Sequence, residues 1–147
     1  MFRPVRRALP LLALMPVLLL TGCGSDSTPT APTTTVTTVT EAFEGTLQRN
    51  AALTHAFIVG TPGTVTVSLS SVTSEHYDSA SPTVIGFSLG TWNTTTELCQ
   101  VVLANDQAIA GRIIVGTAQN SGAFCVRVYD VGRITEPTSY TLTVVHN

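Results

Sequence analysis

From residue 43 onward, hydrophobic and polar residues alternate with a period of two. The clearest case is the run from Thr64 to Ser70, in which Val65, Val67 and Leu69 fall on one face. Strict alternation is typical of a strand with one buried face, because successive side chains of a strand point to opposite sides. The same kind of pattern predicts strands at 43–48, 55–59, 64–70, 84–89, 98–104, 112–115, 123–129 and 139–144.

Turn-forming residues separate these predicted strands, at 60–63, 105–106, 120–122 and 136–137. Short strands at this spacing, with no long helical segment between them, predict an all-β fold: an antiparallel β-sandwich or jelly-roll of about eight strands. Within 41–56 a short helix is the alternative, because Phe43 and Leu47 have helical spacing, but Gly45 and the β-branched residues favour a strand and loop. The segment Ser71–Pro82 is predicted to be the longest loop.

The first part of the chain has a different character. Three arginines lie among the first seven residues, and an apolar run from Ala8 to Leu20 follows. Two prolines interrupt this run, which is short for a membrane span. It ends in Leu20-Thr21-Gly22-Cys23, which resembles the lipobox of bacterial lipoprotein signal peptides. The resemblance implies cleavage before Cys23 and a diacylglycerol on its thiol; the alternative is an ordinary secretory signal with an accidental cysteine.

A stretch rich in Ser, Thr and Pro follows the predicted cleavage site. Gly24–Thr40 lacks the apolar periodicity that could bury a core, so it is predicted to be a disordered stalk that reaches about 50–55 Å when extended. The predicted organisation is therefore a signal peptide at 1–22, the lipidated cysteine and tether at 23–40, and one β-sandwich domain at 41–147. Because Gly24 rather than Asp follows Cys23, the analogy with lipoprotein sorting in enterobacteria favours the outer membrane if the cell is Gram-negative.

The charge distribution narrows the classes of partner. Beyond the predicted signal peptide the chain keeps four arginines and no lysine against nine carboxylates. Such a sparse, acidic surface argues against nucleic acid and against electrostatic binding to anionic lipid. Membrane affinity is therefore expected to come from the acyl lipid on Cys23, and no other cofactor is implied.

Two cysteines, Cys99 and Cys125, remain once Cys23 is assigned to lipidation. An even number of cysteines in an oxidising envelope compartment indicates a disulfide. Two free thiols or a metal-binding pair are the alternatives.

Several segments also resemble a known family. FEGTL at 43–47, HAFIV at 55–59 and PGTVTVSL at 62–69 are similar to the opening of bacterial pre-peptidase C-terminal domains, and 122–129 and 140–144 are similar to their last two strands. The resemblance implies a small, non-catalytic β-sandwich that accompanies exported proteins, with relatives that bind calcium or extracellular matrix. No peptidase precedes the domain here, which implies an accessory role toward a separate chain. The alternating Asp residues common in the family's middle strand are missing from 97–103, which argues against carrying over a calcium site.

One motif suggests hydrolase chemistry. Gly86–Gly90 matches the G-x-S-x-G pattern with Ser88 as the nucleophile, and Asp106, Asp130 and His146 follow in the order of an α/β-hydrolase triad. The motif needs a strand-to-helix turn, but no helical sequence follows it, and about a hundred residues are too few for that fold. His146 is also expected at a fraying end of the chain. The pattern therefore predicts a strand with Ser88 facing away from the core, and a serine hydrolase is kept as a minor alternative.

Candidate ligand-binding residues lie in and after the predicted long loop. Trp92 and Tyr77 are candidates for an aromatic platform that binds a glycan, and Glu75 and Asp78 for oxygen ligands of calcium. The alternatives are a tryptophan that fills the edge of the core and loop charges that are simply solvated. No transition-metal site is predicted, because the histidines are scattered along the chain.

Together these features predict a non-catalytic lipoprotein of the cell envelope, anchored outside the cytoplasm by its lipid. The β-sandwich is expected to act as an interaction or accessory module toward an envelope protein or a glycan. A glycan- or calcium-binding module is the alternative.

Overall fold

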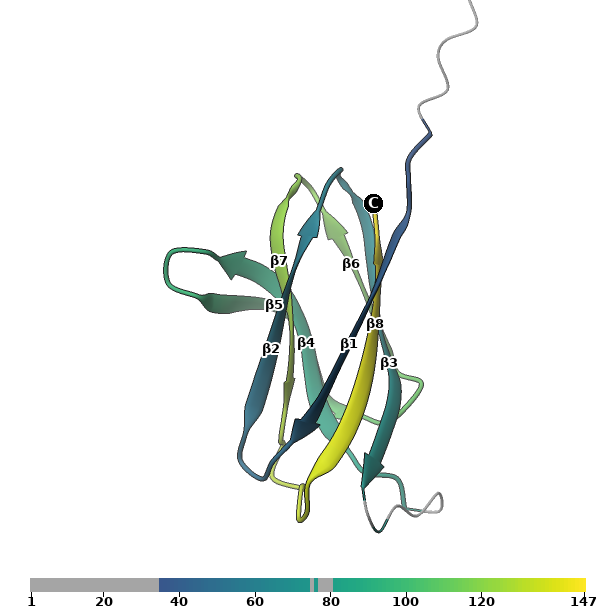
Figure 1. Cartoon of the computed structure of the whole chain (residues 1–147), viewed down its shortest axis with the longest axis vertical. Coiled ribbons are helices and arrows are strands. Elements are labelled where there is room, and N and C mark those ends of the chain that lie inside the picture. Colours follow the sequence, from purple (N-terminus) through teal and green to yellow (C-terminus); the bar gives the residue numbers. More distant parts are fainter. Residues whose placement is uncertain (1–34, 75, 77–80) are drawn as a thin grey trace, which may run out of the picture. The chain divides into compact units, whose positions relative to one another are not determined.

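A computed structural model describes residues 35–74, 76 and 81–147. The predicted signal peptide at 1–22 and the predicted lipidation site Cys23 lie outside this part of the chain. The described residues form eight strands (Figure 1): β1 (Val39–Leu47), β2 (Ala52–Val59), β3 (Gly63–Ser74), β4 (Ile85–Asn93), β5 (Leu98–Ala108), β6 (Ile113–Ala118), β7 (Gly122–Tyr129) and β8 (Thr138–His146). Within these ranges no helix is long and apolar enough to cross a membrane.

The strands form two four-stranded antiparallel sheets, in the orders β1-β8-β3-β6 and β2-β7-β4-β5. The predicted antiparallel β-sandwich is thereby confirmed. Among the described strands, β4 and β5 are the one pair that is consecutive in the chain and hydrogen-bonded. The β4–β5 hairpin is therefore the most locally determined element, and the other pairings join distant segments.

The core lies where the two inner faces meet, and the alternation in the sequence explains it. Val65, Val67 and Leu69 of β3 are buried, as are Leu142 and Val144 of β8. These two strands are neighbours in one sheet, and their partners in register include Leu69 with Leu142. Burying such side chains stabilises the fold by roughly 1.5–3 kcal/mol each.

Several strands extend beyond their predicted limits. β1 begins at Val39, so the last two residues assigned to the tether pair with β8. β3 continues to Ser74, because Val72 is buried and this part of the strand pairs with β8, so the predicted loop at 71–82 begins too early.

The predicted turn at 105–106 is wrong, since β5 runs through it to Ala108 with a shift in register. The helical alternative at 41–56 is also wrong, because that segment forms β1 and most of β2.

The two sheets are joined by side-chain contacts where β1 and β2 lie. The ring of Phe43 stacks on His55 with centroids 5.0 Å apart, and Nε2 of His55 lies 2.8 Å from the hydroxyl of Tyr140. Burial lowers the pKa of His55 and raises the pKa of Tyr140 to about 12, so this contact joins two neutral groups at neutral pH. The expectation that His146 frays is wrong: it is 2% exposed, and its Nε2 lies 2.9 Å from Oε1 of Glu41.

The carboxylate of Asp130 connects two loops at one end of the sandwich. Its Oδ1 accepts hydrogen bonds from the backbone N–H groups of Gly132, Arg133 and Ile134 at 2.7, 2.8 and 3.0 Å. Its Oδ2 accepts a fourth from the N–H of Asn50, at 2.8 Å. Burial pushes the pKa of Asp130 upward, but the four amides outweigh it and hold the pKa below its usual value.

Candidate functional site

The β4–β5 hairpin projects to the side of the sandwich (Figure 1), and a β-bulge in β5 explains this departure. Leu89 pairs with Leu103 and Gly90 pairs with Val101, so Val102 is an extra residue on β5. Such a bulge bends the strand that carries it. Gly90 is required here, because a Cβ at this position would collide with the backbone carbonyl of Gln100.

The tip of the hairpin is held by local hydrogen bonds. Oδ1 of Asn93 accepts from the N–H of Thr95 at 2.9 Å and from the N–H of Thr96 at 3.0 Å. Glu97 closes the turn in the left-handed conformation, with φ of 54°. Asn side chains favour this type of turn, so the hairpin has a defined shape where it leaves the sandwich.

The predicted disulfide between Cys99 and Cys125 is confirmed. Cys125 lies on β7 opposite Gly90, and Cys99 lies on β5 opposite Trp92, so the bond spans β4 where Gly90 has no side chain. Their Cα atoms are 5.8 Å apart, whereas strands two apart in a flat sheet are separated by about 9–10 Å. The sheet is therefore folded sharply at this point, and the disulfide holds the base of the hairpin in the bent position.

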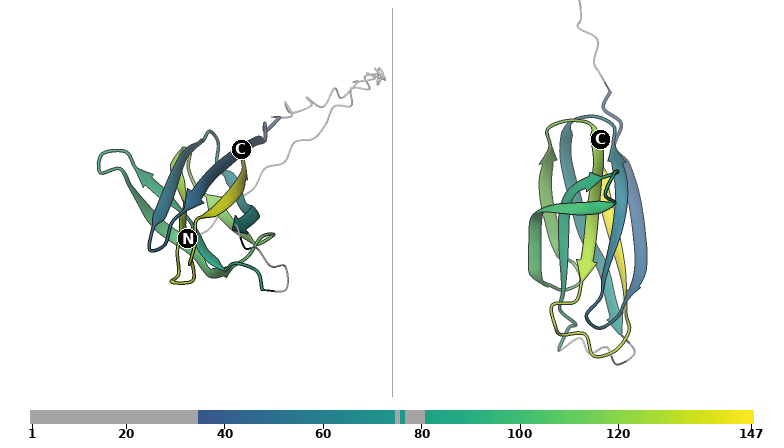
Figure 2. Two further views of the ribbon diagram at one scale, coloured as in Figure 1. Left: turned by 60° about the horizontal axis from the view of Figure 1, so that its bottom comes forward. Right: turned by 90° about the vertical axis from the view of Figure 1, so that its left-hand side faces the viewer.

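Large aliphatic side chains on β5 and β6 are exposed to solvent. On β5 these are Leu98 (62% exposed), Val101, Val102 (70% exposed) and Leu103, and on β6 they are Ile113 and Val115. We call these six residues the β5–β6 seam. β5 and β6 are each the last strand of their sheet, so both have a free edge. Figure 2 (right) views the molecule from the side on which the hairpin projects.

A cavity of about 350 Å³ lies beside the seam and opens to solvent. Its lining is mainly apolar, with Val65 and Leu89 from the core, Val102 and Leu103 from the bulge, and Phe124 from β7. The turn between β6 and β7 supplies its polar wall. The bulge thus directs two consecutive apolar residues of β5 to the same cavity, which strict alternation along a strand would not allow.

The structure separates the residues of the serine-hydrolase alternative. Ser88 is 0% exposed, and its hydroxyl donates to the carbonyl of Arg127 at 3.5 Å. Asp106 accepts from the hydroxyl of Tyr129, Asp130 binds backbone amides, and His146 contacts Glu41. None of the hydrogen bonds of these four side chains joins two of them, so this chemistry gains no support from the fold.

The predicted ligand-binding loop is described only in part. Glu75, Tyr77 and Asp78 lie outside the described residues, so the glycan platform and the calcium ligands stay predictions. Trp92 is half-buried on β4. No group of three or more His, Cys, Asp or Glu side chains that could hold a metal occurs in the part of the chain that the structure describes.

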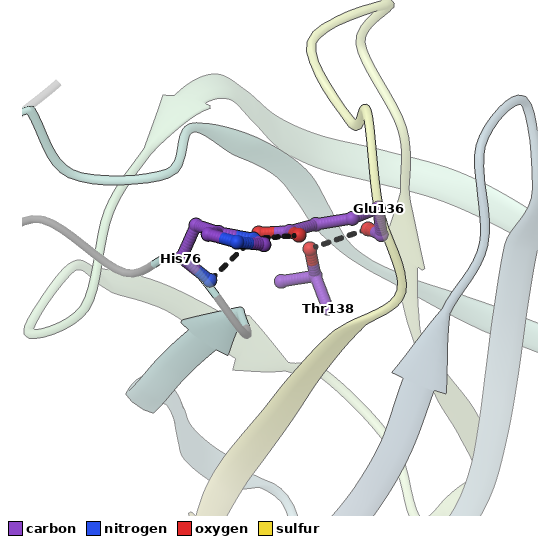
Figure 3. A network of polar contacts seen from close by, with 3 residues as sticks. All are labelled: His76, Glu136 and Thr138. Atoms are coloured by element: carbon purple, nitrogen blue, oxygen red, sulfur yellow. Dashed lines mark hydrogen bonds and ion pairs between the residues drawn. The ribbon is translucent and has the colours of Figure 1, made fainter.

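His76, within that loop, contacts the β7–β8 loop (Figure 3). Its backbone N–H donates to Oε1 of Glu136 at 3.0 Å, and its ring Nδ1 lies 2.7 Å from Oε2. The hydrogen bond from the His76 ring is the main cause that lowers the pKa of Glu136. A polar cavity of about 250 Å³ lies here, between Ser74, Pro82 and Glu136. These contacts fasten one loop to another, and among the described residues that line the cavity the ionisable side chains are Glu136 and Arg133.

No protein-family model matches the chain, and no curated protein matches it in sequence. Solved structures of similar shape include the Yersinia pseudotuberculosis-derived mitogen, at 16% identity over 74% of this chain and 86% of that chain, with a TM-score of 0.49. Another is Aeromonas hydrophila PliG, a periplasmic lysozyme inhibitor of g-type lysozyme, at 12% identity over 73% and 84% of the two chains, with a TM-score of 0.47. The β-sandwich assignment rests on the strand pairing itself. The lipobox and the resemblance to pre-peptidase C-terminal domains stay predictions.

Proposed function

We propose that this chain is a lipid-anchored, non-catalytic lipoprotein of the cell envelope whose β-sandwich binds a partner protein across the β5–β6 seam. The observation that carries the proposal is the exposed aliphatic edge of β5 beside an apolar cavity. Large exposed apolar side chains beside an apolar cavity are typical of sites that a partner covers. The lipobox at Leu20–Cys23 supports the anchor, and the Cys99–Cys125 disulfide supports an oxidising compartment.

The chemistry of the seam favours a protein over a glycan. Its six side chains are aliphatic, whereas Trp92 lies on the same face of the hairpin as the disulfide. β5 is also a long edge strand, since its 11 residues end the sheet and have a neighbouring strand on one side alone in the part of the chain that the structure describes. A long free edge of this kind fits a strand that is covered in the working state of the protein.

The anchor is tested by replacing Cys23 with serine. Without a thiol the chain cannot take the diacylglycerol, so C23S is expected to move from the membrane fraction to the soluble envelope fraction and to lack the mass of the lipid. Ser25→Ala, two residues away, is the control and is expected to behave as the wild type. A wild-type protein that is soluble and carries no lipid would remove the anchor from the proposal.

The binding face is tested by placing a charge on the seam. Full-length Val102→Asp, captured from detergent-solubilised envelopes, is expected to retain at least about tenfold less of the partner than the wild type, because the interface would bury an unpaired carboxylate. Ile58→Asp is the matched control, since Ile58 is 65% exposed on β2, the opposite edge strand of the same sheet. Equal recovery with both variants, or no partner with the wild type, contradicts the proposal.

A further inference from the structure

We infer that the seam binds an extended, cationic segment of the partner protein, which adds as a strand to the free edge of β5 and places an apolar side chain in the cavity beside Val102. This inference rests on the proposed function. It names the form and the chemistry of the part of the partner that is bound.

The backbone of β5 is the first argument. β5 is hydrogen-bonded to β4 on one side and ends its sheet on the other, so the outer N–H and C=O groups of an 11-residue strand face solvent. A segment in extended conformation satisfies such groups by adding to the sheet. The bulge at Val102 divides the edge, which leaves Leu98–Val101 as an uninterrupted stretch for pairing.

The cavity is the second argument. It lies at the point where the bulge interrupts β5, between Val102, Leu103 and Phe124. A strand added at Leu98–Val101 and continuing past the bulge passes over the mouth of the cavity. Side chains of an extended strand point alternately to its two faces, so every second side chain of the added segment points toward the apolar cavity. Main-chain pairing then provides affinity, and the cavity selects an apolar residue.

The charge of the hairpin is the third argument, and it selects the occupant. Residues 85–108 carry two carboxylates, Glu97 and Asp106, and no Lys, Arg or His. Both carboxylates are exposed. Glu97 lies just before the stretch that is open for pairing, and Asp106 lies beyond the bulge, where its Oδ1 also accepts a hydrogen bond from the hydroxyl of Tyr129. A segment of about eight residues, at roughly 3.3 Å per residue, reaches from one to the other. Lys or Arg at its two ends would face these carboxylates, which favours association and sets the register.

A second copy of this chain fits the edge less well. Pairing β5 with β5 of another copy brings two further carboxylates to the edge and no cation, because the hairpin has none. The domain as a whole adds to the repulsion, since residues 41–147 hold eight carboxylates against four arginines and no lysine. We therefore assign the edge to a segment of a different, basic protein.

The first test is photo-crosslinking in intact cells. A photoreactive amino acid replaces Val102 in the full-length protein, with the same substitution at Ile58 as the control, and mass spectrometry maps the crosslinked peptides. The expected result is a crosslink from position 102 alone to one short segment of a partner, with alternating apolar residues and Lys or Arg on both sides.

Each other outcome is informative. A crosslink to a helix or to a folded, acidic surface of a partner overturns the inference and leaves the proposed function standing. A crosslink to a second copy of this chain overturns the inference and replaces the partner by a homodimer. Crosslinks no more specific at position 102 than at position 58 overturn both the inference and the proposed function.

The second test uses the mapped segment as a synthetic peptide, titrated into the full-length protein. Alternate N–H groups of an added strand point toward β5 and away from it. N-methylation at the positions facing β5 is expected to raise Kd at least about tenfold, and at the other positions less than about twofold. Equal effects at both sets of positions rule out strand addition.

A charge reversal tests the recognition of cations. Glu97→Lys is expected to weaken binding of the peptide about tenfold, and a peptide whose facing Lys or Arg is replaced by Glu is expected to recover the loss. Glu44→Lys, an exposed site on β1, is the matched control. Unchanged affinity for the Glu97 variant would remove the electrostatic part of the inference.

Discussion

Replacing Cys99 and Cys125 together by alanine is expected to lower the free energy of unfolding by about 3 kcal/mol, because the disulfide closes a loop in the unfolded chain. The two cysteines are 26 residues apart in sequence. Alanine is the right replacement, since Cys125 is fully buried and a serine hydroxyl there would need a hydrogen-bond partner. Urea denaturation of the full-length protein at constant temperature measures the change.

The same variant is expected to lose the seam as a binding site. Without the bond, Leu98–Val102 is attached to the sandwich through the pairing of β5 with β4, and the register shift at Gly90 weakens that pairing where the hairpin bends. The hydrogen bond between Asp106 and Tyr129 still holds the far end of β5. Amide exchange in Leu98–Leu103 is therefore expected to accelerate more than exchange in β3 or β8, and capture of the partner to fall. The reduced wild-type protein, which keeps both cysteine side chains but lacks the bond, is the control for side-chain packing. Exchange that rises equally in all strands would show that the disulfide acts only on global stability.

The sequence predicts the sandwich well where one residue in two is buried. β3 and β8 are neighbours in one sheet, and the alternating apolar residues in their sequences are almost all buried in the structure. The limits of the strands were less predictable, because they depend on pairing partners. Val39 is in a strand because it lies opposite His146, more than a hundred residues away, and nothing local distinguishes it from the stalk.

The exposure of the β5–β6 seam could not be predicted from the sequence pattern. Val101, Val102 and Leu103 are consecutive apolar residues, and the sequence alone suggests a strand with both faces buried. They are exposed because a bulge interrupts the strand, and the bulge depends on the close approach of Gly90 to Gln100 across the hairpin. The sequence offers one signal for the bulge, since the apolar run at 101–103 interrupts the alternation of the strand.

Among the residues to which the sequence pattern assigned a chemical role, the disulfide cysteines were predicted correctly and the triad candidates were not. Cysteine counting predicted the pair Cys99–Cys125, since the number of cysteines left few choices. Asp130 and His146, in contrast, entered as candidates for a triad and are structural. Their roles depend on Asn50 and Glu41, which lie 80 and 105 residues away and which no motif links to them.

The second large loss of stability is expected from a substitution of Asp130. Asp130→Asn is expected to lower the free energy of unfolding by about 2 kcal/mol, because a charged acceptor that serves four backbone amides becomes a neutral one. The amide group also turns a donor toward one of those N–H groups. Denaturant unfolding at neutral pH measures the loss, and Glu44→Gln, at an exposed site on β1, is the control.

The pH dependence separates this mechanism from a simple packing defect. The pKa of Asp130 is lower in the folded protein than its ordinary value of 3.8, so the unfolded chain takes up the proton first as the pH falls. The stabilisation by the carboxylate is therefore complete above about pH 5 and is lost as the pH falls through the folded pKa, below 3.8. The difference in stability between the wild type and D130N is expected to shrink over that interval. A difference that stays constant from neutral pH down to about pH 2 would show that the charge of Asp130 does not hold the two loops together, and that the geometry of its side chain does.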